Sequence, residues 1–80
     1  MAVDAAGRVF VVDYANHRIQ VFSPDGTFLR QWGSYGSGSG QFVFPSGIAI
    51  SASGLVYIAD TGNYRIQVFD GNGVFMGKWG

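Results

Sequence analysis

The chain consists of two copies of one sequence unit. Residues 2–33 align with residues 49–80 at a constant offset of 47 positions without a gap, and 15 of the 32 aligned pairs are identical. The heptad NHRIQVF at 16–22 returns as NYRIQVF at 63–69. Turn glycines and aromatic residues recur in the same phase, so both halves specify the same structural unit. A repeat of this kind indicates units that pack mainly against their neighbours.

Each unit is predicted to form four short β-strands. The segments RVFVVD (8–13) and LVYIAD (55–60) are apolar at successive positions, which is typical of strands covered on both faces. Each of them is followed by a polar turn and then by a further strand, RIQVFS (18–23) in the first unit and RIQVFD (65–70) in the second. The turn signals SPDG and DGNG then lead to TFLRQW and VFMGKW. With MAVD and GIAIS as first strands, we predict an all-β chain of two antiparallel meanders.

A four-stranded meander that is apolar on both faces has to be covered on both sides. Radial stacking in a β-propeller is the usual way to cover such sheets. Two blades cannot close a ring, and their two outer faces would expose more apolar surface than the roughly 300–600 Å² patch found on a typical monomer. We therefore predict that the chain associates with further copies of itself.

The repeat also matches a known family. The second unit, GIAISASGLVYIADTGNYRIQVFDGNGVFMGKWG, preceded by GSGSGQFVFP, closely resembles the NHL repeat. The first unit, AVDAAGRVFVVDYANHRIQVFSPDGTFLRQWGSYGSGSGQF, resembles it equally. The resemblance covers nearly the whole chain and implies a β-propeller, most often six-bladed, whose first strands line a central channel. Three chains of two blades each would complete such a ring as a homotrimer.

The resemblance divides the chain into blade 1 (1–33), a Gly/Ser-rich linker (34–46) and blade 2 (47–80). Blade 1 has only Met1 in place of the lead-in found at 45–48, so its first strand is expected to be short. The join between successive chains is expected to be the weakest interface for the same reason. The linker glycines do not have the spacing of a phosphate-binding loop, and we predict a flexible connection in which Gln41, Phe42 and Phe44 dock again.

Composition excludes several classes of partner. The five acidic residues, all Asp, balance the five Lys and Arg, and Cys is absent. A chain without net charge is not attracted to nucleic acid or to an anionic membrane, and one without Cys has no disulfide or thiolate zinc site. No signal-peptide pattern or membrane-spanning apolar run is found, so the chain is expected to be soluble. Its compartment stays open, as does whether it is a segment of a longer repeat protein or a designed chain.

Two sets of residues are predicted to hold the fold together. A carboxylate, an amide and a guanidinium converge at the turn between the second and third strands of each unit. These are Asp13, Asn16 and Arg18 in the first unit and Asp60, Asn63 and Arg65 in the second. Their repetition favours a structural turn network over a ligand site. Trp32 and Trp79 end the fourth strands and are predicted to be buried anchors between blades.

The functional prediction is a non-catalytic scaffold or interaction module without metal or cofactor. The turns and the linker are expected at one rim, where Tyr14, His17, Tyr35 and Tyr64 form a candidate surface for a protein or peptide. Two alternatives stay open from the resemblance. Peptide-amidating lyases of this type use metal-binding His residues around the channel, and the NHL domains of tripartite-motif ubiquitin ligases bind RNA through basic surfaces. A single His and a balanced charge disfavour both.

Overall fold

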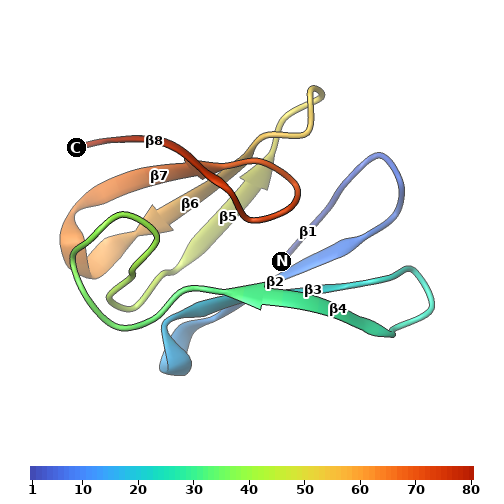
Figure 1. The fold of residues 1–80 in the computed structure, drawn as a ribbon, viewed down its shortest axis with the longest axis horizontal. Helices are drawn as coiled ribbons and strands as arrows, with labels where there is room; N and C mark the ends of the chain where they lie inside the picture. Colours follow the sequence, from blue (N-terminus) through green and yellow to red (C-terminus); the bar gives the residue numbers. More distant parts are fainter.

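The computed structural model describes residues 1–80 as two four-stranded antiparallel sheets joined by a loop (Figure 1). Blade 1 contains β1 (Ala2–Val3), β2 (Val9–Asp13), β3 (Arg18–Phe22) and β4 (Phe28–Trp32). Blade 2 contains β5 (Gly47–Ile50), β6 (Val56–Asp60), β7 (Arg65–Phe69) and β8 (Phe75–Trp79). The strands of each sheet lie in chain order, so the prediction of two antiparallel meanders is confirmed. The first strand of blade 1 is short, as expected, with 2 residues against 4 in β5.

The two blades share their irregular features as well as their strands. Each has one turn of 3₁₀ helix between its second and third strands, η1 (Tyr14–Asn16) and η2 (Thr61–Asn63). The next residue is left-handed in both, with φ of 53° at His17 and 56° at Tyr64. A bulge interrupts the pairing of the third and fourth strands at the same place in each blade. The sequence repeat is therefore a repeat of backbone conformation.

Cross-strand pairing gives each blade two distinct faces, because residues paired across antiparallel strands point to the same side. The tryptophan face carries Phe10, Val12, Ile19, Val21 and Trp32 in blade 1 and Tyr57, Ala59, Ile66, Val68 and Trp79 in blade 2. The phenylalanine face carries Val9, Val11, Phe22 and Phe28 in blade 1 and Val56, Ile58, Phe69 and Phe75 in blade 2.

The hydrophobic core lies between the blades, where the tryptophan face of one blade packs against the phenylalanine face of the other. It is formed by the tryptophan face of blade 1, the phenylalanine face of blade 2 and one linker residue, Phe42. The fully buried members are Phe10, Ile19, Val21, Phe42, Val56, Ile58 and Phe69. Each side chain of this size stabilises the fold by about 1.5–3 kcal/mol when it is fully buried. The stability of the pair therefore depends on the contact between blades rather than on either sheet alone.

The linker packs against blade 2 (green loop in Figure 1). Tyr35 and Phe42 form a parallel bridge across its base, and Phe42 and Pro45 are buried. The sequence predicted that Gln41, Phe42 and Phe44 dock again. Phe42 is buried, the Gln41 carbonyl accepts hydrogen bonds from Arg65 and Gln67, and the Phe44 ring packs on Tyr14 and His17 at the surface rather than in the core. Phe44 is 42% exposed and has a φ of 47°, and the next residue, Pro45, is buried.

The two tryptophans have different environments. Trp32 packs against the core, with its ring over Phe69 at a centroid distance of 5.4 Å. Trp79 is 57% exposed, so the prediction that both are buried is wrong for Trp79 in the single chain. The reason is geometric: Trp32 faces the next blade of the same chain, whereas the tryptophan face of blade 2 has no blade against it. No helix in the structure has the length and apolar character needed to cross a bilayer.

Candidate functional site

The turn network of blade 2 is built around the buried carboxylate of Asp60. Its side chain is fully buried and accepts hydrogen bonds from Asn63 Nδ2 at 2.9 Å, Arg65 Nε at 2.8 Å and Gln67 Nε2 at 3.1 Å. Its other oxygen accepts the backbone N–H of Val43 at 2.8 Å. A buried carboxylate with four donors is fully satisfied, so this cluster fixes the η2 turn on the end of β6.

The outer donors of the same network hold the linker in place. Arg65 donates from its two Nη atoms to the carbonyl oxygens of Ser37, Gly38 and Gln41, at 2.8, 2.8 and 2.9 Å. Gln67 Nε2 donates to the Gln41 carbonyl at 2.7 Å, and its oxygen accepts from the N–H of Gly40. The turn network of blade 2 is therefore also a binding site for main-chain groups of a glycine-rich loop.

Blade 1 has the same network without the loop. Arg18 Nε donates to Asp13 at 2.8 Å, and Asn16 Nδ2 and Gln20 Nε2 donate to the same carboxylate at 3.1 Å. Neither Nη atom of Arg18 has a partner, and no backbone N–H reaches Asp13. The side chains of Asp13 and Arg18 are 20% and 35% exposed, against 0% and 9% for their counterparts in blade 2.

Both carboxylates are stabilised in the ionised form. Burial pushes the pKa of Asp60 upward, but the hydrogen bonds from Val43, Asn63, Arg65 and Gln67 outweigh burial and hold the pKa below its usual value. The hydrogen bonds from Arg18 and then Asn16 lower the pKa of Asp13. Charged carboxylates paired with arginine are suited to a structural role, since neither is poised to exchange a proton near neutral pH.

An aromatic cluster forms at the rim beside these turns. The His17 ring lies 4.9 Å from Tyr35 and 4.6 Å from Phe44, and Tyr14 lies 4.9 Å from Phe44. His17 Nδ1 accepts the backbone N–H of Phe44 at 2.9 Å, which ties the η1 turn to the linker. Three of the four predicted rim residues are thus brought together, with Phe44, which the sequence prediction did not include.

Tyr64 occupies the position of His17 in blade 2 but does not join the aromatic cluster. It is 87% exposed and makes no aromatic contact. His17 is covered by the linker that follows blade 1, and no segment of the chain lies over Tyr64 in the same way. Both turns therefore carry an aromatic side chain at the rim, but the linker covers only the one at His17.

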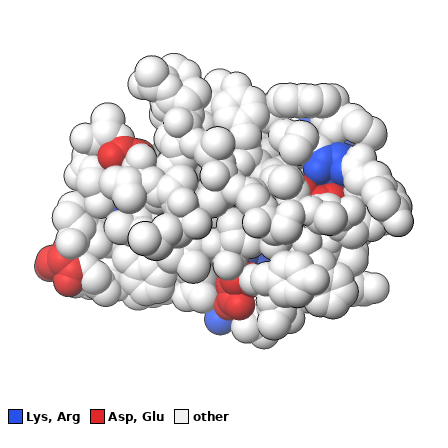
Figure 2. All heavy atoms as spheres, turned by 180° about the vertical axis from the view of Figure 1, so that it is seen from behind, with Lys and Arg blue, Asp and Glu red and all other residues white.

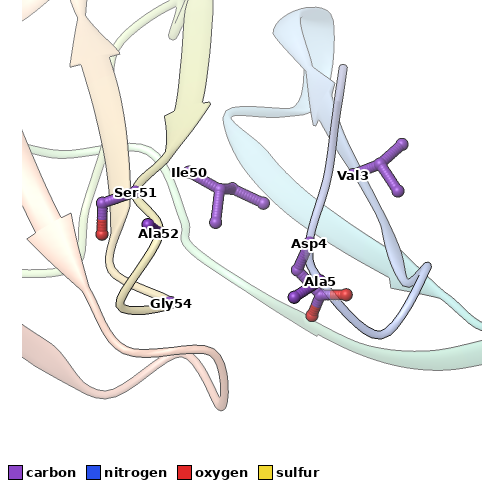
Figure 3. A pocket seen from close by; sticks show the side chains of 7 residues that line it. All are labelled: Val3, Asp4, Ala5, Ile50, Ser51, Ala52 and Gly54. Atoms are coloured by element: carbon purple, nitrogen blue, oxygen red, sulfur yellow. The ribbon is translucent and has the colours of Figure 1, made fainter.

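A shallow recess of about 260 Å³ lies between the blades at the opposite end (Figure 3). It is lined by residues 3–5 of blade 1 and by residues 50–52 and Gly54 of blade 2. Its one charged lining group, Asp4, is paired with Arg8 at 2.7 Å. Ile50 points across the recess while Val3 points away from it (Figure 3). The recess offers small apolar side chains and no free charge.

Charged groups are sparse on the surface and stand mostly in pairs of opposite sign. On the face shown in Figure 2, Lys and Arg form no continuous patch, and blue and red atoms adjoin at separate spots. No three His, Cys, Asp or Glu side chains come together as a metal site.

The sequence analysis missed Gln20, Gln67 and Arg30. The two glutamines recur at offset 47 on the same strand face as the network arginines, and this pattern could have revealed them. Arg30 donates to the carbonyl of Gly71 across the blade interface at 3.1 Å. Its counterpart in blade 2 is Gly77, so repetition gave no signal for it.

Two four-stranded meanders that pack face to face, each with the same turn network, define a repeat protein built from propeller-type blades. The family model described as NHL repeat matches residues 1–22 and 42–69. The chain belongs to the NHL repeat family, as the resemblance predicted.

Three relatives illustrate the range of proteins that contain such repeats. The chain is 52% identical over 45 residues to RING finger protein nhl-1 of Caenorhabditis elegans and 49% identical over 51 residues to peptidyl-glycine alpha-amidating monooxygenase of Mus musculus. It is 38% identical over 50 residues to protein brain tumor of Drosophila melanogaster. These matches cover 56%, 58% and 62% of the chain but only 5% of each relative. NHL repeats therefore occur in an enzyme, the amidating monooxygenase, and in proteins whose names do not indicate an enzymatic activity.

Proposed function

We propose that the chain is a non-catalytic NHL scaffold that assembles with copies of itself, two blades per chain, into a closed six-bladed ring. The supporting observation is that its two free faces are the same two kinds of face that already pack together inside the chain. No blade lies against the tryptophan face of blade 2 or the phenylalanine face of blade 1, and each carries an exposed aromatic side chain, Trp79 on the first and Phe28 on the second.

The exposed residues have counterparts at the internal interface that are partly buried. Phe28 is 49% exposed and Trp79 is 57% exposed, whereas their equivalents Phe75 and Trp32 pack against the core. Gly73 shows the fit most clearly, since a Cβ built on it would lie 2.8 Å from the Trp32 ring, while Gly26 has open space at the same position. We infer that Trp79 of one copy lies over Gly26 of the next.

An interface between unlike faces is heterologous, so it closes into a ring only when the rotation per chain divides a full turn. Six blades is the number implied by the NHL resemblance, and chains of two blades reach it as a trimer. The aromatic rim of Tyr14, His17, Tyr35 and Phe44 would then recur three times on one side of the ring, as a surface for a protein or peptide.

The alternative functions have less support. The single histidine has its Nδ1 occupied by the N–H of Phe44, and the five cations are balanced by five carboxylates. An RNA-binding surface gains most of its affinity from unpaired basic groups. The enzymatic activity named for the amidating relative belongs to a protein of which the chain covers 5%.

The proposal predicts that two variants, each blocked on one face, complement each other. Val11→Lys places a charge on the phenylalanine face of blade 1, where the counterpart Ile58 is fully buried. Ile66→Lys does the same on the tryptophan face of blade 2, where the counterpart is the fully buried Ile19. Each variant alone should have the mass of one chain, 8.6 kDa, and an equimolar mixture should form a particle of twice that mass.

Light scattering coupled to size exclusion measures these masses, and Ser53→Lys, at an exposed turn, serves as the control that assembles like the unmodified chain. Variants that assemble alone, or a mixture that contains only single chains, would contradict the assignment of the faces.

A further inference from the structure

The aromatic cluster at the rim is a row of four rings from two segments of the chain. Successive ring centroids lie 4.9 Å apart from Tyr14 to Phe44, 4.6 Å from Phe44 to His17 and 4.9 Å from His17 to Tyr35. Much of the row faces solvent, since Tyr14 is 55% exposed, Phe44 42% and Tyr35 68%. Large aromatic side chains gathered at the surface of a rigid fold are typical of a recognition site.

The backbone holds two of these rings in an unfavourable conformation. His17 and Phe44 are both left-handed, with φ of 53° and 47°, although neither is glycine. Residues with a Cβ keep such angles only where the surrounding structure fixes them. For Phe44 the contact is the hydrogen bond from its N–H to His17 Nδ1 at 2.9 Å. The η1 turn and the linker therefore present their rings in a defined arrangement.

The free polar groups of the row are hydrogen-bond donors. Because His17 Nδ1 accepts a hydrogen bond, the neutral imidazole carries its hydrogen on Nε2, and this N–H has no partner within the chain. The hydroxyl groups of Tyr14 and Tyr35 have no partner either. The adjoining segment 43–46 offers no main-chain donor, because its N–H groups are bonded within the chain and Pro45 has none. A ligand cannot pair with this segment as an added β-strand.

We propose that the row binds a proline-rich segment of another protein in the polyproline II conformation. The proposal rests on the rim surface of the proposed function and gives its ligand class, but it does not need the ring of blades. Proline rings pack on aromatic side chains, and the carbonyls between them can accept hydrogen bonds from tyrosine hydroxyls and an imidazole N–H. Since proline has no N–H, packing on the rings leaves no donor of the ligand buried without an acceptor.

The arrangement of the rings favours such a helix over other ligands that stack on aromatic side chains. Neighbouring ring planes are inclined by 36°, 60° and 74°, so the row has ridges and grooves rather than the flat face on which a base or a sugar stacks. The nearby charges of Asp13 and Arg18 are paired with each other, which suits an uncharged ligand. The row is no longer than roughly five residues of a polyproline helix, which rises about 3.1 Å per residue.

The test uses the full chain and an octaproline peptide with a fluorescent label. Fluorescence anisotropy should show saturable binding below millimolar concentration. A Gly-Ser peptide of the same length, which has carbonyls but no rings, should bind at least tenfold more weakly. Backbone amide shifts measured by NMR should change at residues 14, 35 and 44 and stay unchanged at the recess lined by residues 3–5.

Surface variants keep the test independent of folding. Tyr14→Ala and Tyr35→Ala should each weaken binding at least fivefold, and Tyr35→Phe, which removes only the hydroxyl, should weaken it about threefold. Tyr64→Ala is the matched control and should leave binding unchanged, because Tyr64 is 87% exposed and makes no aromatic contact. All three tyrosines are exposed, so the urea midpoint of each variant should equal that of the unmodified chain.

Absence of saturation at millimolar octaproline, or equal weakening by Tyr64→Ala and Tyr35→Ala, would overturn the site. Displacement of the label by a soluble oligosaccharide or by oligouridine at a lower concentration than by unlabelled octaproline would overturn the ligand class. The particle mass measured in the same samples separates this proposal from self-assembly: binding to single chains contradicts the ring alone, and trimers that bind no octaproline contradict the proline-rich ligand alone.

Discussion

Replacing Trp32 with alanine is expected to lower the free energy of unfolding by about 3–5 kcal/mol. The ring lies between the blades, 6.3 Å from Phe10 and 5.4 Å from Phe69, and covers Gly73. Its removal leaves a cavity at the centre of the blade interface. The loss should be the same at low and high protein concentration, because the contact lies within one chain. Urea denaturation at two concentrations measures it.

Two matched variants make the Trp32 result specific. Trp32→Phe keeps an aromatic ring and removes an indole N–H that is buried without a partner, so its cost should be much smaller. Trp79→Ala should change stability only at concentrations at which chains associate, and should abolish the rise of Tm with concentration. Equal losses for Trp32→Ala and Trp79→Ala at every concentration would show that the two faces are not used as described.

Replacing Asp60 with asparagine is expected to lower the free energy of unfolding by about 3 kcal/mol, the lower end of the range for breaking a buried ion pair. The substitution puts an amide N–H₂ among donors from Asn63, Arg65 and Gln67 and leaves the Arg65 charge without its partner. The linker should loosen as well, since Arg65 and Gln67 hold it. Denaturant unfolding and hydrogen exchange at Gly40 and Val43 measure the two effects.

Asp13→Asn is the matched control, and it should be less damaging because its network is partly exposed and holds no loop. The pH dependence gives an independent check. The lowered pKa of Asp60 means that its contribution is fully present above the ordinary carboxyl pKa and is lost as pH falls through the lowered value. The stability difference between the unmodified chain and Asp60→Asn should therefore shrink in acid. A difference that stays constant with pH would contradict the role of the charge.

The sequence predicts the blades well because each local signal is repeated in phase. Turn residues, strand patterns and the Asp-Asn-Arg network recur at offset 47, and the structure repeats them down to the left-handed residues at 17 and 64. The different burial of Asp13 and Asp60 could not be predicted from these residues. It arises because the linker folds back on blade 2, a tertiary contact with no counterpart in blade 1.

The linker and Trp79 also have environments that could not be predicted from the local sequence. A Gly/Ser-rich composition predicts a flexible connection and does not indicate the hydrogen bonds that Arg65 donates to the carbonyls of Ser37, Gly38 and Gln41. Tryptophan at the end of a strand predicts a buried anchor, but burial of Trp79 depends on whether another blade lies against it. The local sequence gives the chemical groups of a residue, but the burial of that residue depends on which other segment of the fold packs against it.

The mass of the unmodified chain in solution tests the central claim most directly. Native mass spectrometry over a dilution series should show a particle of about three times 8.6 kDa that dissociates to single chains, with a Tm that falls on dilution. Mainly dimers or tetramers would contradict the six-blade ring while leaving the blades as described. A compact 8.6 kDa particle with a cooperative melt that does not depend on concentration would contradict self-assembly itself.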